Sequence, residues 1–268
     1  MIQIENTTKI FNQGTVDENT AIKDVNLNID KGDFITIIGS NGAGKTTLFN
    51  LIAGSIFPTV GRILVNKKDL TKEPEYKRAK FIGRIFQDPM LGTSSNMNLE
   101  DNMMICLKKG FKGLKISLNR KMREFFKEQL APLEMDLEHR LKDNVALLSG
   151  GQRQALTLLM MVLSKPSLAL LDEHTAALDP KNAQVVLDLT TRFITDYKLT
   201  TMMITHNMNQ AIQYGNRLLM MDGGEIILDV KGQEKQDLTV EKLVERFHQI
   251  RKKDFGTDEV LLSDRECT

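Results

Sequence analysis

The stretch "GSNGAGKT", from Gly39 to Thr46, decides how the rest of the chain is interpreted. It matches G-x-x-x-x-G-K-[ST], a loop whose backbone N–H groups surround phosphate oxygens. The apolar run "DFITII" precedes it and "TTLFNLIAG" follows with helical spacing, which is the context that the pattern requires. A plain glycine-rich turn is the weaker alternative. The stretch therefore predicts a site for a nucleoside triphosphate.

Within this loop the chemistry assigns separate tasks to individual side chains. Lys45 is expected to reach the β- and γ-phosphates, and the Thr46 hydroxyl to bind Mg²⁺. The N-terminus of the following helix adds a partial positive charge. The ATP-binding residues predicted here are Gly39, Ser40, Asn41, Gly42, Ala43, Gly44, Lys45, Thr46 and Thr47.

A second stretch, "LALLDEHTAALDP" (168–180), ends an apolar run with two acids. Asp172, at the end of a predicted strand, is placed to help hold Mg²⁺, and Glu173 to polarise the attacking water. On its own the stretch has an equally good alternative. A buried strand stops at polar residues, and Asp179 with Pro180 begins the next helix.

Composition limits the classes of function. The chain has 268 residues, 41% of them hydrophobic, and a net charge of +1, so no global charge favours binding to nucleic acid. Cys106 and Cys267 form no metal-binding pattern and fit a reducing compartment. No secretory signal is evident, and the longest apolar stretches fall short of the roughly 20 residues of a membrane span. Contact with a membrane is thus expected through a partner.

The order of patterns predicts an α/β fold. Strand-like runs fill the first third, helical spacing dominates residues 88–165, and strands return in "SLALLD" and "LTTMMITH" with a helix over 180–197 between them. Strands that alternate with helices are typical of a parallel sheet with crossover connections. We expect one domain over residues 1–225, with 88–165 inserted as a helical subdomain, and a short strand and helix extension over 226–268.

The segment "LLSGGQRQA" (147–155) resembles the signature sequence of ATP-binding cassette (ABC) ATPases. A serine and two glycines that open a helix form a second anion-binding N-terminus, although Ser149 is also explained as a plain helix cap. The ordered set is more specific. "GSNGAGKT", "IFQDP", "LSGGQRQ", "LALLDE", "ALDP" and "MMITHN" together resemble this family across residues 1–225.

The resemblance implies a P-loop NTPase (RecA-like) core with an N-terminal antiparallel β-subdomain and an inserted helical subdomain. It makes Lys45, Glu173 and His206 catalytic, with Glu173 as general base and His206 as the switch that contacts the γ-phosphate. His174 stands where many relatives have proline, and only a role in shaping the loop is suggested for it.

Other roles implied by the resemblance concern metal, adenine and a second subunit. The metal residues would be Thr46, Gln87 and Asp172. Phe11 would stack on adenine, with burial in the β-subdomain as the alternative. The residues expected to meet ATP held by the other subunit, with Asp179 at the dimer seam, are Ser149, Gly150, Gly151 and Gln152.

Partners also follow from the resemblance, which points to bacterial import systems for amino-acid-related solutes. It implies a head-to-tail homodimer at the cytoplasmic face of the membrane, with a separate permease and indirectly an extracytoplasmic binding protein. Export or lipoprotein release is the alternative, and a non-transport ABC ATPase is less favoured. Four methionines are expected either to contact the permease or to lie in the core: Met90, Met97, Met103 and Met104.

Overall fold

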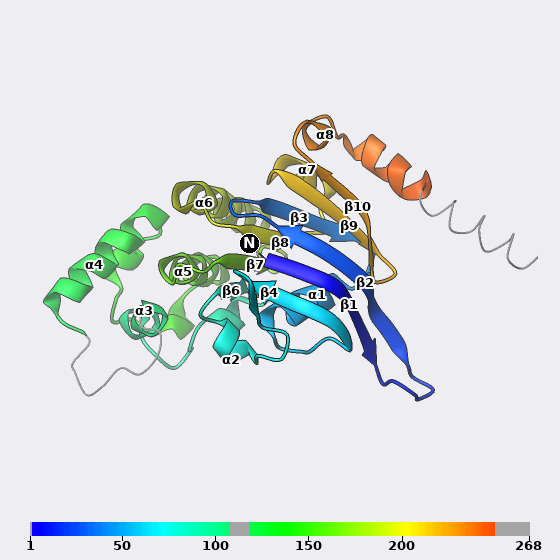
Figure 1. Ribbon diagram of the computed structural model, residues 1–268. Helices are drawn as coiled ribbons and strands as arrows, with labels where there is room; N and C mark the ends of the chain where they lie inside the picture. The colour runs from blue at the N-terminus through cyan, green and yellow to red at the C-terminus, as the bar shows by residue number, and fades with distance from the viewer. Residues whose placement is uncertain (1, 108–117, 250–268) are drawn as a thin grey trace, which may run out of the picture.

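The structure is a computed structural model that describes residues 2–107 and 118–249. Its larger sheet has six strands, and these run in the order β10 (Glu225–Lys231), β9 (Arg217–Asp222), β3 (Phe34–Gly39), β8 (Thr201–Ile204), β7 (Leu168–Asp172) and β6 (Ile82–Ile85). All neighbouring pairs are parallel except β9 with β10. The strands β3, β7 and β8 therefore end at one edge of the sheet (Figure 1).

The smaller sheet is antiparallel and lies against the first. Its strands run in the order β2 (Asn19–Ile29), β1 (Ile2–Phe11), β4 (Val60–Val65) and β5 (Lys68–Asp69). Its inner face shares one apolar core with helix α1 and the adjoining face of the larger sheet. The expected antiparallel N-terminal subdomain is confirmed.

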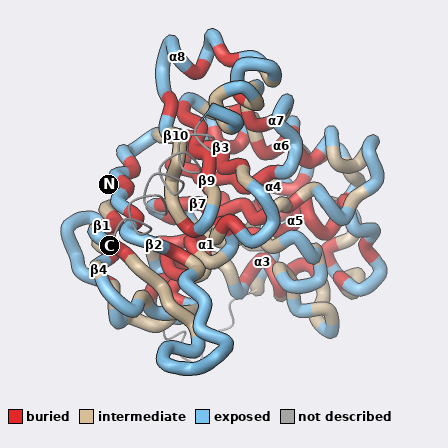
Figure 2. The backbone as a smooth tube through the Cα atoms, turned by 90° about the vertical axis from the view of Figure 1, so that its right-hand side faces the viewer, coloured by how far each residue is buried: buried red, intermediate tan, exposed pale blue. Residues whose placement is uncertain are grey.

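Helices surround the larger sheet, and the buried residues concentrate on its strands and on α5 (Figure 2). They are α1 (Lys45–Ala53), α2 (Glu75–Arg78), α3 (Leu99–Leu107), α4 (Arg120–Leu130), α5 (Gly150–Leu163), α6 (Pro180–Tyr197), α7 (Met208–Gln213) and α8 (Gln233–Gln236). Short 3₁₀ turns occupy Pro89–Gly92, Ala131–Leu133, Leu137–His139 and Val145–Leu147. No helix in the described part of the chain is both long and apolar enough to cross a bilayer.

The helical insertion follows β6 and precedes β7 in the chain. Its helices α3, α4 and α5 share an apolar core that also includes α6. Met103 and Met104 are buried in this core, whereas Met90 is 52% exposed. Met103 and Met104 are therefore core residues, in agreement with the second of the two interpretations.

Strand β10, at the expected domain boundary, continues the larger sheet. It pairs with β9 along its length, and Val230 is buried against Leu218 and Leu243. Residues 240–249 are helical, and residues 250–268 of the expected extension lie outside the described residues. The larger sheet therefore continues past residue 225, and a domain boundary at this residue stays a prediction.

Candidate nucleotide site

The phosphate loop joins the end of β3 to the start of α1. Gly44, immediately before the helix, has φ 94° in the left-handed region. A Cβ atom there would lie 2.5 Å from the carbonyl oxygen of Ala21 in β2. Only glycine fits this conformation and this close approach, so the loop is held against the smaller sheet by its own sequence.

Lys45 is the first residue of α1, directly after the phosphate loop turns at Gly44. Its Nζ donates to the carbonyl oxygens of Gly39 and Ser40, both at 2.9 Å. Burial lowers the pKa of Lys45, and the charges of Glu173 and Asp172 act in the opposite direction. Because the first N–H groups of a helix have no acceptor within it, the lysine and the start of α1 together could hold an anion.

A hollow of about 340 Å³ joins this loop to Phe11. Phe11, at the end of β1, is half-buried, and Lys9 Nζ lies 5.0 Å from the centre of its ring. Glu173 and His206 line the same hollow. The structure thus brings Phe11 to the phosphate loop, where its ring could stack on adenine.

A second hollow, of about 680 Å³, lies on the other side of Thr46. Thr46, Gln87 and Asp172 line it, and all three carry the oxygen ligands that Mg²⁺ prefers. The Asp172 side chain is only 10% exposed and already has one positive neighbour, because Arg84 Nη2 lies 3.0 Å from its Oδ2. The oxygen donors that these three residues present to one hollow nevertheless fit a metal beside the phosphate loop.

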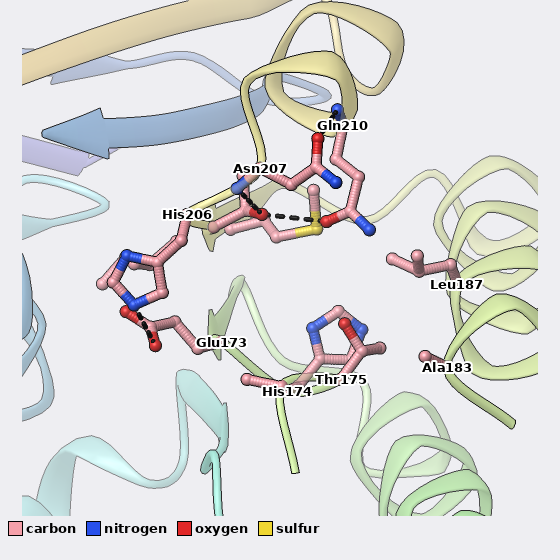
Figure 3. A pocket seen from close by; sticks show the side chains of 12 residues that line it. Glu173, His174, Thr175, Ala183, Leu187, His206, Asn207 and Gln210 are labelled. Carbon is pink, nitrogen blue, oxygen red and sulfur yellow. Dashed lines mark hydrogen bonds and ion pairs between the residues drawn. The ribbon is translucent and has the colours of Figure 1, made fainter. Parts of the chain in front are cut away.

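Glu173 and His206 face each other at the ends of β7 and β8. Figure 3 shows the His206 ring directed at the Glu173 carboxylate, with Nε2 2.5 Å from Oε2. Glu173 adopts a left-handed backbone conformation, φ 48°, and its N–H donates to the carbonyl of Ile204 at 3.2 Å. Two of the three predicted catalytic side chains, Glu173 and His206, are thus in contact within one chain.

His174, in contrast, points away from Glu173 toward α6 (Figure 3). Its Nε2 lies 3.0 Å from Thr190 Oγ1, and its carbonyl accepts from Gln154 Nε2 at 2.6 Å. The Thr190 hydroxyl donates to the carbonyl of Val186, so the histidine Nε2 is the donor in this pair. His174 therefore anchors the loop after Glu173 to both α5 and α6.

Burial also lowers the pKa of His174, from 6.5 to about 4. Between these values the unfolded chain takes up a proton and the folded chain does not, so stability should fall as pH falls through this window. The loss is on the order of 3 kcal/mol at most. We expect urea unfolding at pH 7, 5.5 and 4.5 to show a smaller loss for His174→Gln than for the unmodified chain. Equal losses would contradict the assignment.

The signature residues open α5. Ser149 caps the helix, with the Gln152 N–H donating to its Oγ at 3.2 Å and the Ser149 N–H donating to Gln152 Oε1 at 3.1 Å. A Cβ on Gly151 would lie 3.0 Å from Cγ of Asn182 in α6. Asp179 caps that helix, because its Oδ1 accepts from the Asn182 N–H at 3.1 Å. Ser149 and Asp179 therefore both act as helix caps, one for α5 and one for α6, and the two helix starts lie side by side.

The structure does not bring the signature to the phosphate loop of the same chain. Where the chain is described, Ser149 and Gly150 are exposed, and the linings of both hollows contain no signature residue. The N-terminus of α5 is therefore exposed and separate from the phosphate loop of its own chain.

Two polar residues at the site were not predicted from the sequence. Arg84 in β6 pairs with Asp172, and Gln154 in α5 bridges the carbonyls of Phe86 and His174 at 3.1 and 2.6 Å. A lone arginine within the apolar run "FIGRIF" is the signal that could have identified the first, because a buried cation requires a counter-ion. Gln154 lies within the quoted stretch "LSGGQRQ", but the role predicted for that stretch concerned residues 149–152 only.

The fold and the site at this edge of the sheet are those of a P-loop nucleoside triphosphatase. The family described as ABC transporter matches residues 22–176. A tyrosine transport ATP-binding protein of Clostridioides difficile (strain R20291) is 44% identical over 248 residues, which are 92% of this chain and 98% of that protein. The chain belongs to the ABC transporter family as an ATP-binding, ATP-hydrolysing subunit.

Solved structures agree with this assignment. The cassette MJ0796, solved as a dimer in a post-hydrolysis state with ADP and phosphate, is 26% identical with a TM-score of 0.70, covering 86% of this chain and 98% of that one. The cbiO1 protein of Clostridium perfringens, part of the transporter complex cbiONQ, is 26% identical with a TM-score of 0.72, covering 96% and 97%.

Proposed function

We propose that this chain powers the uptake of a small solute, an amino acid in the first instance, through a separate membrane permease. The observation that carries this proposal is the 44% identity to a tyrosine transport ATP-binding protein along 92% of the chain. Export or lipoprotein release is the alternative, because the ATP-site motifs alone do not distinguish the direction of transport.

In the proposed reaction Glu173 accepts a proton from the attacking water. Lys45 and His206 stabilise the charge on the γ-phosphate, the term that usually contributes most to such catalysis. The 2.5 Å contact between His206 and Glu173 supports a joint role in catalysis. In this proposal His206 orients the Glu173 carboxylate until the γ-phosphate competes with Glu173 for the histidine.

Nucleotide and metal are assigned to the two hollows. Phe11 stacks on adenine, and residues 39–47 bind the phosphates. Thr46, Gln87 and Asp172 would hold Mg²⁺, which when bound neutralises phosphate charge. Their common hollow and their oxygen donors support this assignment.

A head-to-tail homodimer completes each site. Ser149, Gly150, Gly151 and Gln152 of one chain meet the ATP bound by the other, and Asp179 lies at the seam. The exposed N-terminus of α5, separate from its own phosphate loop, supports this arrangement.

The permease is proposed to bind next to Gln87, which places the chain on the cytoplasmic face of the membrane. Met90 and Leu91 in this segment are 52% and 64% exposed, and Leu91 lines the same hollow as Gln87. An extracytoplasmic binding protein would reach the ATPase only through the permease, and no nucleic acid is involved.

Uptake of labelled tyrosine, phenylalanine and other amino acids by cells with and without the gene tests the proposed function. We expect the deletion to reduce accumulation of one of them, and a plasmid copy to restore it where a Glu173→Gln copy does not. Unchanged uptake of every amino acid together with faster loss of a preloaded solute in the unmodified cells would favour export.

A further inference from the structure

Arg84 places a positive charge directly beside the carboxylate assigned to the metal. Its Nη2 lies 3.0 Å from Asp172 Oδ2, and each side chain is about 10% exposed. Strand β6 delivers Arg84, and its neighbour β7 delivers Asp172. The carboxylate therefore has a counter-ion supplied by the chain itself.

Two further contacts fix the guanidinium in this place. Nη1 donates to Asn50 Oδ1 at 2.7 Å, and the group stacks on the Phe86 ring with 4.6 Å between Cζ and the ring centre. Asn50 follows Thr46 by four residues in α1, so the two share a face of the helix. Arg84 thus links the phosphate-loop helix to the end of β7.

The Arg84 guanidinium pairs with the Asp172 carboxylate although one of its own nitrogens is left without a hydrogen bond in the described part of the chain. Among the residues that the structure describes, none makes a hydrogen bond with the buried Nε of Arg84, and burying an arginine in this way is costly unless a charge compensates. The compensating charge is Asp172, which lines one hollow together with Thr46 and Gln87. Any metal in that hollow would share the carboxylate with Arg84.

We propose that Arg84 is a positioning residue that acts as the counter-ion of Asp172. It neutralises the Asp172 carboxylate while no metal is bound, and it competes with Mg²⁺ for that carboxylate. This inference rests on the proposed metal role of Asp172. Two opposite effects follow for a chain without Arg84. Metal-free ATP binds less tightly, because an uncompensated carboxylate repels its phosphates, and Mg²⁺ binds more tightly, because no internal cation competes.

The test is Arg84→Met, measured by equilibrium binding without turnover. A fluorescent ATP analogue is titrated in EDTA, and Mn²⁺ binding to the ADP complex is followed by electron paramagnetic resonance. We expect metal-free affinity to fall about fivefold and Mn²⁺ affinity to rise about tenfold, as for a partly buried charge pair. Arg84→Lys, which keeps the charge, should lie closer to the unmodified chain on both measures.

Two controls separate this effect from loss of packing. Arg123→Met breaks a 2.7 Å ion pair with the buried Glu100 between α4 and α3, and should change neither affinity. If Arg84→Met does not fold, Arg84→Gln removes the charge but keeps a donor, and the same opposite shifts are expected. Parallel weakening of both affinities, or no change in either, would overturn the proposal.

Asp172→Asn distinguishes failure of the inference from failure of the metal site. If this variant keeps normal Mn²⁺ affinity, the proposed metal role of Asp172 is wrong, and the inference falls with it. If Asp172→Asn loses Mn²⁺ affinity while Arg84→Met leaves it unchanged, the metal site stands and only the role of Arg84 is wrong.

Discussion

Glu173→Gln is expected to abolish turnover while ATP still drives the chain into a dimer. The amide keeps the size of the side chain and can still meet His206, which lies 2.5 Å from the carboxylate, but it cannot accept a proton from water. Loss of a general base costs about 10²- to 10⁴-fold in rate. Release of inorganic phosphate measures the turnover, and size-exclusion chromatography with ATP measures the dimer.

Glu75→Gln is the matched control for this variant. Glu75 is an acid that lines the hollow beside Asp172, and its Oε2 accepts a hydrogen bond from Ser55 Oγ at 2.6 Å. We assign it no part in the reaction, so phosphate release should stay near normal. Near-normal phosphate release by Glu173→Gln would remove Glu173 as the base.

His206→Ala is expected to lose far more hydrolysis than His174→Ala. The first removes a side chain that contacts Glu173 and lines the phosphate hollow, and loss of one such charge-stabilising group costs about 10²- to 10³-fold. The second removes a buried side chain that anchors the loop through Thr190, so it should lower stability and retain most of the turnover.

Phosphate release and urea unfolding of both variants check this expectation side by side. The two should separate, with turnover lost at 206 and stability lost at 174. Equal losses of turnover, measured where both chains are folded, would assign the switch role to neither histidine alone.

The parts of the fold predicted from the sequence are those with local signals. The helix over 180–197 has the predicted bounds because Asp179 caps it and Pro180 is favoured at its first position. The strand ends at Gly39 and Asp172 were predicted because an apolar run stops at glycine or acid. Motifs placed at the ends of parallel strands then converge at one edge, as sheet topology requires.

The parts that were not predicted depend on contacts between distant segments. Arg84 meets Asp172 only because β6 lies beside β7, and the sequence does not determine this pairing of residues 88 positions apart. The same applies to His174, whose partner Thr190 is on α6. Strand β9, Arg217–Asp222, is a short apolar run whose place beside β3 is likewise set by packing.

The most direct test of the proposed ATP site shared between two chains is a mixing experiment in the Glu173→Gln background. One chain carries Lys45→Ala in the phosphate loop and the other carries Ser149→Arg at the exposed signature. Neither variant should dimerise with ATP by itself, because both ATP sites of its homodimer would carry the substitution. Mixed, they should form a heterodimer that holds one ATP, measured by light scattering and nucleotide counting. Dimers of the Ser149→Arg chain alone, or no heterodimer on mixing, would contradict the account.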